Sequence, residues 1–95
     1  MTTQTLQDNA LFQTGFLVDG VWKTLDTTFD VLNPATGEVI AKVAKAGKKE
    51  TEDAIAAASR AFPAWRAKTA KERSTILYRW YELIIENKSW LGRLM

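Results

Sequence analysis

The residues of this 95-residue chain that could bind another molecule by type and spacing are aromatic and basic side chains in its C-terminal half. They are Trp65, Trp80, Trp90, Arg66, Arg79 and Arg93. An aromatic ring stacks on a nucleobase while a nearby guanidinium contacts the backbone, so one hypothesis is a surface for single-stranded nucleic acid. The same residues recur at helical spacing, where tryptophans usually face a core and arginines face solvent. We favour the second interpretation and expect no nucleic-acid partner.

Side chains for covalent or acid–base chemistry are scarce. The chain has no cysteine and no histidine. This excludes a disulfide, a zinc-thiolate site and a cysteine nucleophile within the chain, and it removes the commonest general base. Nor is there a Gly-rich turn from strand to helix of the kind that binds dinucleotides. We therefore assign no catalytic and no cofactor-binding residue, and we expect no cofactor bound to this chain.

The composition is typical of one globular domain, with 46% hydrophobic residues, 25% charged residues and a net charge of +2. No apolar run approaches the ~20 residues of a membrane span. The polar N-terminus lacks the pattern of an export signal, so we expect a cytoplasmic protein without a membrane partner. We interpret residues 1–14 as a flexible leader in which Leu11 and Phe12 dock on the rest of the chain.

The first half of the chain predicts short strands. Asp19-Gly20 suits a type I′ turn between strands at about residues 16–18 and 21–23, because Gly accepts a positive φ. A further strand, with Phe29 and Val31 facing inward, should stop at Pro34. Gly37 closes the following turn. Residues 39–44 then alternate, with Val39, Ala41 and Val43 on one face and Ile40, Lys42 and Ala44 on the other.

After Gly47 the apolar period becomes helical. One narrow stripe contains Ala54, Ile55, Ala58, Ala61 and Phe62, and its small side chains indicate close packing against another backbone. Acidic residues occupy the first turn, where the helix dipole favours them. Pro63 disfavours a helical conformation at the preceding residue, which predicts that this helix ends or kinks at about Ala61–Phe62.

A second helix should run from Ala70 to the end of the chain. Thr69 and Glu72 have the spacing of a capping box. The apolar residues of this helix cover about half its circumference, which is more than a simple surface helix shows, so it needs neighbours on two sides. Asn87 interrupts that arc near its middle. The sequence up to Met95 contains no stop signal after a finished apolar pattern, which is typical of an incomplete domain.

The order of these pieces resembles the N-terminal segment of the aldehyde dehydrogenase superfamily. The resemblance rests on "NPATGE" between two strands, then "AFPAWRAKTAKERSTIL", then a long helix ending "LGRLM", and it covers about residues 15–95. The form "PAWRAKTAKERSTIL" is most similar to the succinate-semialdehyde dehydrogenase branch, with the glutarate-semialdehyde enzymes close beside it. We therefore expect an α/β fragment, with short strands and a hairpin followed by two α-helices, that opens the cofactor-binding domain.

The resemblance implies a parent enzyme that oxidises succinate semialdehyde to succinate with NADP or NAD, in 4-aminobutyrate breakdown. In that family a cysteine attacks the aldehyde, hydride passes to the nicotinamide, and a glutamate activates the water that releases the acid. This chain has no cysteine, so for these residues the resemblance implies a scaffold role and no catalytic residue. The expected partner is the remainder of the parent enzyme, which is expected to be a homo-oligomer.

One metal site is also implied by the resemblance alone. Some family members hold a structural monovalent cation on main-chain carbonyls just before the Asn-Pro pair, and Val31 and Leu32 match that position. An ordinary strand end is the simpler interpretation of the same residues.

Two functional hypotheses follow. The favoured one is a catalytically inactive N-terminal segment of a semialdehyde dehydrogenase. The alternative is a small α/β module that binds a partner through the apolar face of helix 70–95, a face that also predicts self-association.

Overall fold

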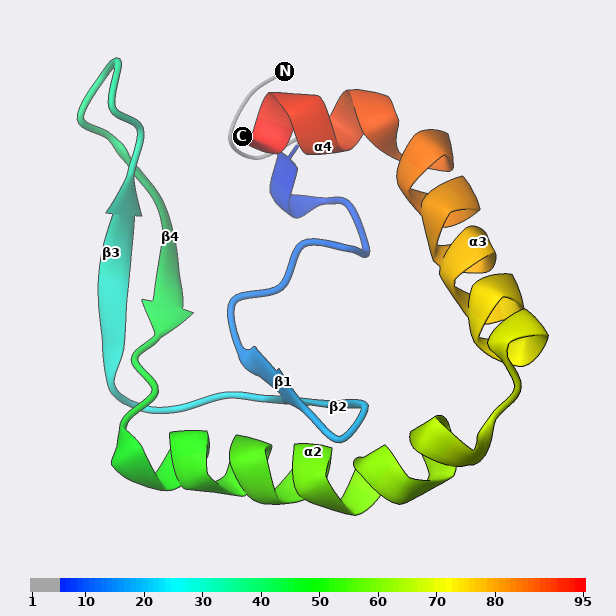
Figure 1. The fold of residues 1–95 in the computed structure, drawn as a ribbon. Coiled ribbons are helices and arrows are strands. Elements are labelled where there is room, and N and C mark those ends of the chain that lie inside the picture. The colour runs from blue at the N-terminus through cyan, green and yellow to red at the C-terminus, as the bar shows by residue number, and fades with distance from the viewer. Residues whose placement is uncertain (1–5) are drawn as a thin grey trace.

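The computed structural model describes residues 6–95 (Figure 1). Two strand pairs precede three helices: β1 (Phe16–Val18), β2 (Val21–Lys23), β3 (Thr28–Leu32), β4 (Val39–Ala44), α2 (Lys48–Ala67), α3 (Ala70–Glu86) and α4 (Lys88–Leu94). Each sheet has two antiparallel strands, β1 with β2 and β3 with β4. The predicted α/β class and the predicted strand positions are confirmed.

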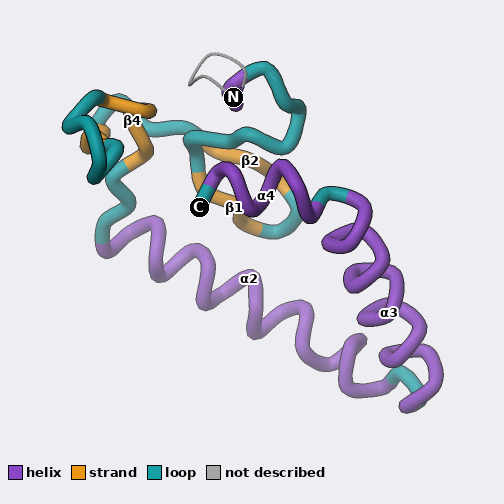
Figure 2. The backbone as a smooth tube through the Cα atoms, turned by 90° about the horizontal axis from the view of Figure 1, so that it is seen from above, coloured by secondary structure: helices purple, strands orange, loops and turns teal. Residues whose placement is uncertain are grey.

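The elements surround an open centre instead of stacking into layers. Figure 1 shows β3–β4, α2, α3 and α4 following one another around the outside, with the β1–β2 hairpin on the inside. Figure 2, viewed from above, shows α2 and α3 running in different directions and meeting only at one end. Among the described residues there is no central sheet covered by helices, so no layer arrangement provides a core there.

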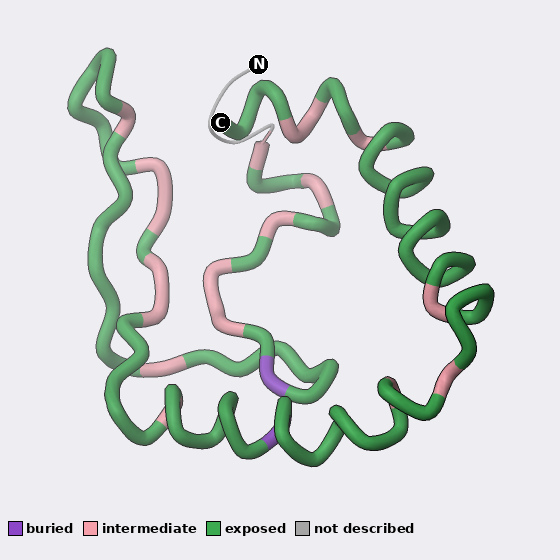
Figure 3. The backbone as a smooth tube through the Cα atoms, viewed as in Figure 1, coloured by how far each residue is buried: buried purple, intermediate pink, exposed green. Residues whose placement is uncertain are grey.

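The β1–β2 hairpin closes through the predicted type I′ turn. Asp19 and Gly20 both have positive φ, 53° and 73°, and Val18 pairs with Val21 across the turn. The hairpin places Val18 against α2, where Val18 is 7% exposed and Ala57 is 8% exposed. Among the described residues these two side chains are the buried hydrophobic core, as Figure 3 shows by its two short purple segments.

The turn between β3 and β4 is closed by Asn33. Its side-chain oxygen accepts a hydrogen bond from the Ala35 N–H at 2.9 Å, and its carbonyl accepts one from the Gly37 N–H at 2.7 Å. Gly37 has φ 77°, in the left-handed region that glycine adopts without strain. Pro34, which has no N–H to donate, sits inside this turn and not in the ladder, as predicted.

A bulge changes which side chains share a face in β4. Val31 pairs with Ala41 but Leu32 pairs with Val39, so Ile40 is the extra residue. An extra residue in one strand shifts the following side chains to the other face. Ile40 therefore lies on the same side as Ala41 and Val43, and the prediction that placed it on the opposite face is wrong.

Phe29 in β3 lies on the predicted face but is not buried. It pairs with Val43, so it shares the face of Val31, Ala41 and Val43, which border the concave side of the chain. Every residue of β3 is exposed, and Phe29 keeps 49% of its surface accessible. The alternation of apolar and polar residues is present, but no second layer lies over this face of the two-stranded ribbon. Asp30 on the opposite face pairs with Lys42 of β4, with 2.8 Å between carboxylate and ammonium.

The first helix does not end at Ala61–Phe62, because α2 continues through Pro63 to Ala67, and the predicted alternative, a kink at that point, stays a prediction. An internal proline removes one helical hydrogen bond, but good helix formers on both sides maintain the backbone conformation. The Arg66 guanidinium lies 5.6 Å from the centre of the Phe62 ring, one turn apart, so a side-chain contact spans the proline.

The face of α2 that packs is not the predicted stripe. Ala57 contacts the hairpin, and Asp53, Ala56 and Arg60 border the same junction. Ile55 and Phe62 of the stripe are 61% and 54% exposed. The centre of the stripe lies about 100° around the helix from Ala57. All five residues of the stripe are exposed, so the side that the pattern marked as apolar is not the side that packs.

The predicted single helix from Ala70 to the chain end is two helices. It begins as expected, with Thr69 and Glu72 forming the capping box, but α3 ends at Glu86 and α4 starts at Lys88. Asn87 has φ −105° and ψ 12°, and its side-chain amide donates to the Leu83 carbonyl at 2.8 Å. This bond to the preceding turn competes with continuation of the helix, so α4 turns away from the line of α3 (Figure 1).

The open arrangement leaves the molecule extended. Its radius of gyration is 16.6 Å, where a compact chain of this length has about 12 Å. Its accessible surface is 7678 Å², where a folded monomer of this mass exposes about 5500 Å². No helix within residues 6–95 is both long enough and apolar enough to cross a membrane.

Candidate functional site

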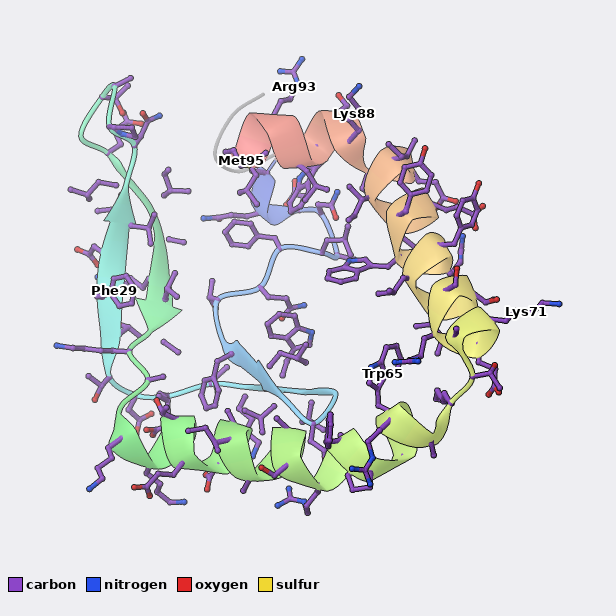
Figure 4. All side chains as sticks on the ribbon, in the orientation of Figure 1. Phe29, Trp65, Lys71, Lys88, Arg93 and Met95 are labelled. Atoms are coloured by element: carbon purple, nitrogen blue, oxygen red, sulfur yellow. The ribbon has the colours of Figure 1, made fainter. Side chains whose placement is uncertain are left out.

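An apolar hollow with a volume of 680 Å³ lies on the concave side of the chain. Figure 4 shows side chains from the inner strands, the ribbon and the C-terminal helices pointing into this space. We call this surface the central hollow, and its lining residues are Leu11, Phe12, Gln13, Trp22, Val31, Ile40, Ala41, Val43, Trp80, Leu83, Ile84, Asn87, Trp90, Leu91 and Leu94.

The helical residues of the central hollow follow from the sequence period. Trp80, Leu83, Ile84 and Asn87 recur every three or four residues and so share one side of α3. The break at Asn87 then turns α4 so that Trp90 lies on the same concave surface. A straight helix would have continued past the ring, so the helix break that the sequence analysis missed is what encloses the hollow on this side.

Across the hollow, the bulge in β4 supplies the facing residues. Ile40, Ala41 and Val43 line the hollow together with Val31 of β3. The N-terminal segment crosses below α4, where Leu11 and Phe12 reach the hollow and the Gln7 side-chain amide donates to the Ile40 carbonyl at 2.6 Å. Residues 1–5 of the predicted leader lie outside the described part of the chain.

The chemistry of the central hollow is that of a packing surface. None of its lining residues is Asp, Glu, Lys, Arg, His or Cys, so the lining supplies no general acid, general base or nucleophile. Its polar groups are the side-chain amides of Gln13 and Asn87 and the indole N–H groups of three tryptophans, Trp22, Trp80 and Trp90. The hollow is therefore suited to receive apolar protein surface.

The Trp90 indole lacks a hydrogen-bond acceptor. Its Nε1–H is buried, yet no acceptor within residues 6–95 lies within hydrogen-bond distance. The same holds for the Nε–H of Arg73, next to the corner formed by Trp65 and Leu77. Buried N–H groups normally have a partner. Two donors therefore remain unsatisfied on the concave side of the chain.

The helix N-termini are not suited to binding the phosphates of a dinucleotide. At α2 the Glu50 carboxylate accepts from the Gly47 N–H at 2.9 Å. At α3 the Glu72 carboxylate accepts from the Thr69 N–H at 3.3 Å and from the Thr69 hydroxyl at 3.0 Å. Each anion-binding position is thus filled by a carboxylate of the chain itself, and the two antiparallel strand pairs do not form a parallel strand–helix–strand unit. These two helix N-termini therefore do not offer a phosphate site for a dinucleotide, and the expectation that no cofactor binds to this chain stays a prediction.

The residues of the predicted cation site lie at the end of β3. Val31 and Leu32 are its last two residues, on either side of the register shift opposite Ile40. The nearby carboxylate of Asp30 is paired with Lys42. Within residues 6–95 no group of three or more acidic, histidine or cysteine side chains is close enough to hold a metal ion. A site at Val31 and Leu32 would have to use carbonyl oxygens alone from this part of the chain, and it stays a prediction.

The aromatic and basic residues considered for nucleic-acid binding are separated in space. Trp80 and Trp90 line the central hollow, whereas Arg79 is on the other side of α3 and pairs with Glu86 at 3.5 Å. Figure 4 shows Arg93 pointing away from the hollow and Trp65 pointing into the ring. The geometry favours the interpretation of core-facing tryptophans and solvent-facing arginines.

Known proteins contain sequences similar to this chain. The sequence pattern of the aldehyde dehydrogenase family matches residues 22–95. The chain is 54% identical over 92 residues to glutarate-semialdehyde dehydrogenase of Pseudomonas putida, covering 95% of this chain and 19% of that protein. It is 48% identical over 92 residues to the NADP-dependent succinate-semialdehyde dehydrogenase of Escherichia coli, with the same two shares.

A solved structure gives the same result in three dimensions. The crystal structure described as an E. coli NADP-dependent enzyme superposes with a TM-score of 0.85 at 48% identity, covering 88% of this chain and 18% of that one. The chain thus spans about a fifth of the length of the curated relatives that it matches. The open ring exists in that structure as one part of a much longer chain.

Proposed function

The chain belongs to the aldehyde dehydrogenase family, and we propose that it is the opening scaffold segment of an NAD(P)-dependent semialdehyde dehydrogenase. We propose succinate semialdehyde as the substrate of the whole enzyme and glutarate semialdehyde as the second candidate. Both are short aldehydes with a carboxylate at the other end, and relatives named for each are about half identical to this chain.

Two observations together support the proposal: the chain is highly identical to these enzymes, and its described residues form almost no hydrophobic core. The chain matches these enzymes over nearly its full length, yet only Val18 and Ala57 are buried among the described hydrophobic residues. Selection for an apolar surface that stays exposed is unusual, because such patches associate or aggregate. A surface covered by the other four fifths of a family-length enzyme explains both facts.

In this proposal the central hollow receives apolar side chains of the rest of the enzyme. Those side chains would bury the inner residues of α3, and an acceptor among them would satisfy the Trp90 indole. The role of the segment is to position the outer helices and the β3–β4 ribbon around the domain that binds the cofactor. The nucleophile, the base and the cofactor site would all come from outside these residues.

The hypothesis of an independent partner-binding module has less support. A module that folds by itself needs a core of its own, and below about 100 residues the available core is already small. Here the inner sides of α3 and α4 line the central hollow and do not pack on a second layer within residues 6–95.

A chimera tests the proposal. The matching fifth of the E. coli succinate-semialdehyde dehydrogenase is replaced by this chain, and turnover of succinate semialdehyde with NADP is measured. We expect activity within about tenfold of the parent, since a scaffold exchange leaves the reacting groups in place and costs at most ~1.4 kcal/mol of transition-state stabilisation. A second chimera carrying Ile84→Asp should lose activity, because it buries an unpaired charge in the hollow. A folded but inactive first chimera would refute the proposed role.

A further inference from the structure

Arg73 lies in the corner where α2 meets α3, and Figure 4 shows Trp65 pointing into the ring from the end of α2. The residues that border this corner are Trp65, Ala70, Arg73, Ser74, Leu77 and Tyr78. The Nε atom of Arg73 is buried, yet no acceptor within residues 6–95 lies within hydrogen-bond distance. One edge of a permanently charged side chain is therefore without a partner in this part of the chain.

Arg73 is on the side of α3 that faces the central hollow. Trp80 follows it after seven residues and Ile84 after eleven, so both lie within about 20° of Arg73 around the helix. Both of these side chains line the central hollow. Arg73 is only about 10 Å along the helix from Trp80. An element of the remaining enzyme that fills the hollow and follows this side of α3 would therefore cover Arg73 as well.

The sequence around this corner is basic. Residues 60–79 contain one acid, Glu72, and six basic residues, which are Arg60, Arg66, Lys68, Lys71, Arg73 and Arg79. The Glu72 carboxylate accepts hydrogen bonds from the N–H and the hydroxyl of Thr69. Arg73 forms no ion pair with another residue of the range 6–95. This excess of positive charge favours a negatively charged partner for Arg73.

The chemistry of the guanidinium specifies the kind of partner. The group stays protonated, so covering it with protein requires a compensating negative charge. Nε and the neighbouring Nη present two parallel N–H groups, which match the two oxygens of a carboxylate. The Ser74 hydroxyl is a further donor at the border of the same corner. These groups together fit an acidic side chain better than a neutral carbonyl.

We propose that Arg73 binds an aspartate or glutamate side chain of the remaining enzyme, and that this ion pair closes the corner between α2 and α3. The proposal rests on the proposed function, because the carboxylate belongs to the other four fifths of a family-length enzyme. The same covering surface brings apolar side chains to the central hollow and the carboxylate to Arg73. The ion pair thus fixes where that surface meets α3, and Arg73 takes no part in the reaction itself.

Thermal inactivation of the E. coli chimera measures the contribution of Arg73. Arg73→Met should inactivate at least tenfold faster than the parent chimera at pH 8, because it leaves the partner carboxylate buried without a counter-charge. Arg79→Met is the matched control on the same helix. Arg79 is exposed and pairs with Glu86 at the surface, so the inactivation rate of this control should stay within about twofold of the parent.

The pH dependence of the inactivation rate distinguishes a carboxylate from a neutral acceptor. Without Arg73, burial raises the pKa of the orphaned carboxylate in the folded enzyme, so its destabilising effect is largest at pH 8 and decreases as acid neutralises it. The ratio of the Arg73→Met rate to the parent rate should therefore fall severalfold between pH 8 and pH 5.5. Arg73→Lys retains a counter-charge, so its rate should be severalfold above the parent rate at both pH values.

The isolated 95-residue chain supplies the structural control. There Arg73→Met should leave the ellipticity at 222 nm unchanged, because Met and Arg have similar helix propensities and Arg73 has no partner in the chain. A loss of helix content would overturn the proposal, since the effect would then arise within these residues.

The remaining outcomes are equally decisive. A rate ratio independent of pH would indicate a neutral acceptor, and equal rates for Arg73→Met and Arg79→Met would indicate no partner, so either result overturns the proposal. If the Arg73→Met chimera does not fold, an Arg73→Lys rate equal to that of the parent overturns it. An inactive parent chimera refutes the scaffold role and the Arg73 ion pair together, whereas an active chimera that tolerates Arg73→Met refutes the ion pair alone.

Discussion

The side chains of Thr69 and Glu72 each accept a hydrogen bond from the other residue's backbone N–H at the start of α3. The Glu72 N–H donates to the Thr69 hydroxyl oxygen at 3.1 Å, and the Thr69 N–H donates to the Glu72 carboxylate at 3.3 Å. The Thr69 hydroxyl also donates to the same carboxylate at 3.0 Å. This reciprocal cap satisfies orphan groups of the first turn and fixes the point at which the chain turns from α2 into α3.

Because of this cap, the helix content of the chain should depend on pH. The hydrogen bond from the Thr69 side chain, followed by that from its backbone N–H, lowers the pKa of Glu72 below 4.5. A lowered pKa in the folded state means that the ionised carboxylate stabilises the helix at pH values above 4.5. That contribution is lost as the pH falls through the folded-state pKa. Ellipticity at 222 nm should therefore fall on acidification, and it should fall less in Glu72→Gln. An identical acid profile in the variant would contradict this role of the cap.

Two glycines in different backbone regions should respond oppositely to alanine. Gly92 lies inside α4 with open space around the position of an added Cβ, so Gly92→Ala should stabilise the helix by about 1 kcal/mol. Gly37 also has space but has φ 77°, so Gly37→Ala should destabilise the β3–β4 turn by about 1 kcal/mol. Nuclear magnetic resonance shifts of α4 and of the ribbon report each change separately. Equal effects of both substitutions would show that backbone conformation is not the cause.

Asn87 is predicted to determine the angle between α3 and α4. Asn87→Ala removes the side-chain bond to the Leu83 carbonyl and introduces a better helix former, so the two helices should join into one. The expected result is higher ellipticity at 222 nm and loss of contacts between residues 11–13 and α4. Ser89→Ala, two positions further on, is the control, because serine is a poor helix former like asparagine and this change retains the Asn87 bond. The prediction fails if both variants keep the break.

The isolated chain is predicted to have no aldehyde dehydrogenase activity. The whole sequence lacks a cysteine nucleophile, and the lining of the central hollow holds no titratable group. A purified 95-residue protein of verified mass should produce no NADH or NADPH above background with succinate or glutarate semialdehyde. Measurable turnover that survives repeated purification would refute the scaffold role.

Local features of the fold followed from the sequence wherever one residue type determines the backbone. Asp19-Gly20 and Gly37 adopt positive φ, Pro34 lies in a turn, and Thr69 caps a helix where the spacing indicated. These are short-range effects, because the residues that form each feature are neighbours in the chain. They were sufficient to predict every strand and the start of each long helix.

The missed features depend on longer-range or competing interactions. The bulge at Ile40 depends on pairing with β3, and Pro63 was tolerated because the helix formers around it outweigh one lost hydrogen bond. The central hollow needed the β4 bulge and the break at Asn87 together, so no periodic pattern could reveal it. Asn87 was the one available signal, because an amide within an apolar arc has a reason to bond to the backbone.

The exposed apolar stripe of α2 has a different explanation. Its alanines and Ile55 indicated packing, yet the helix packs through Ala57. In the proposed enzyme the stripe would be covered by residues outside this chain, so the pattern describes the whole protein and not its first fifth. The same reasoning applies to Phe29 in β3.

Differential scanning calorimetry of the dilute 95-residue chain tests the central claim most directly. A domain of this length with a core of its own unfolds in one cooperative transition, with a heat-capacity increase of about 1.2 kcal/mol/K. Because only Val18 and Ala57 are buried hydrophobic residues within residues 6–95, we predict no cooperative endotherm and less than about half of that heat-capacity change. A single sharp endotherm with the full increase would show that these residues form an independent domain, and it would contradict the scaffold account.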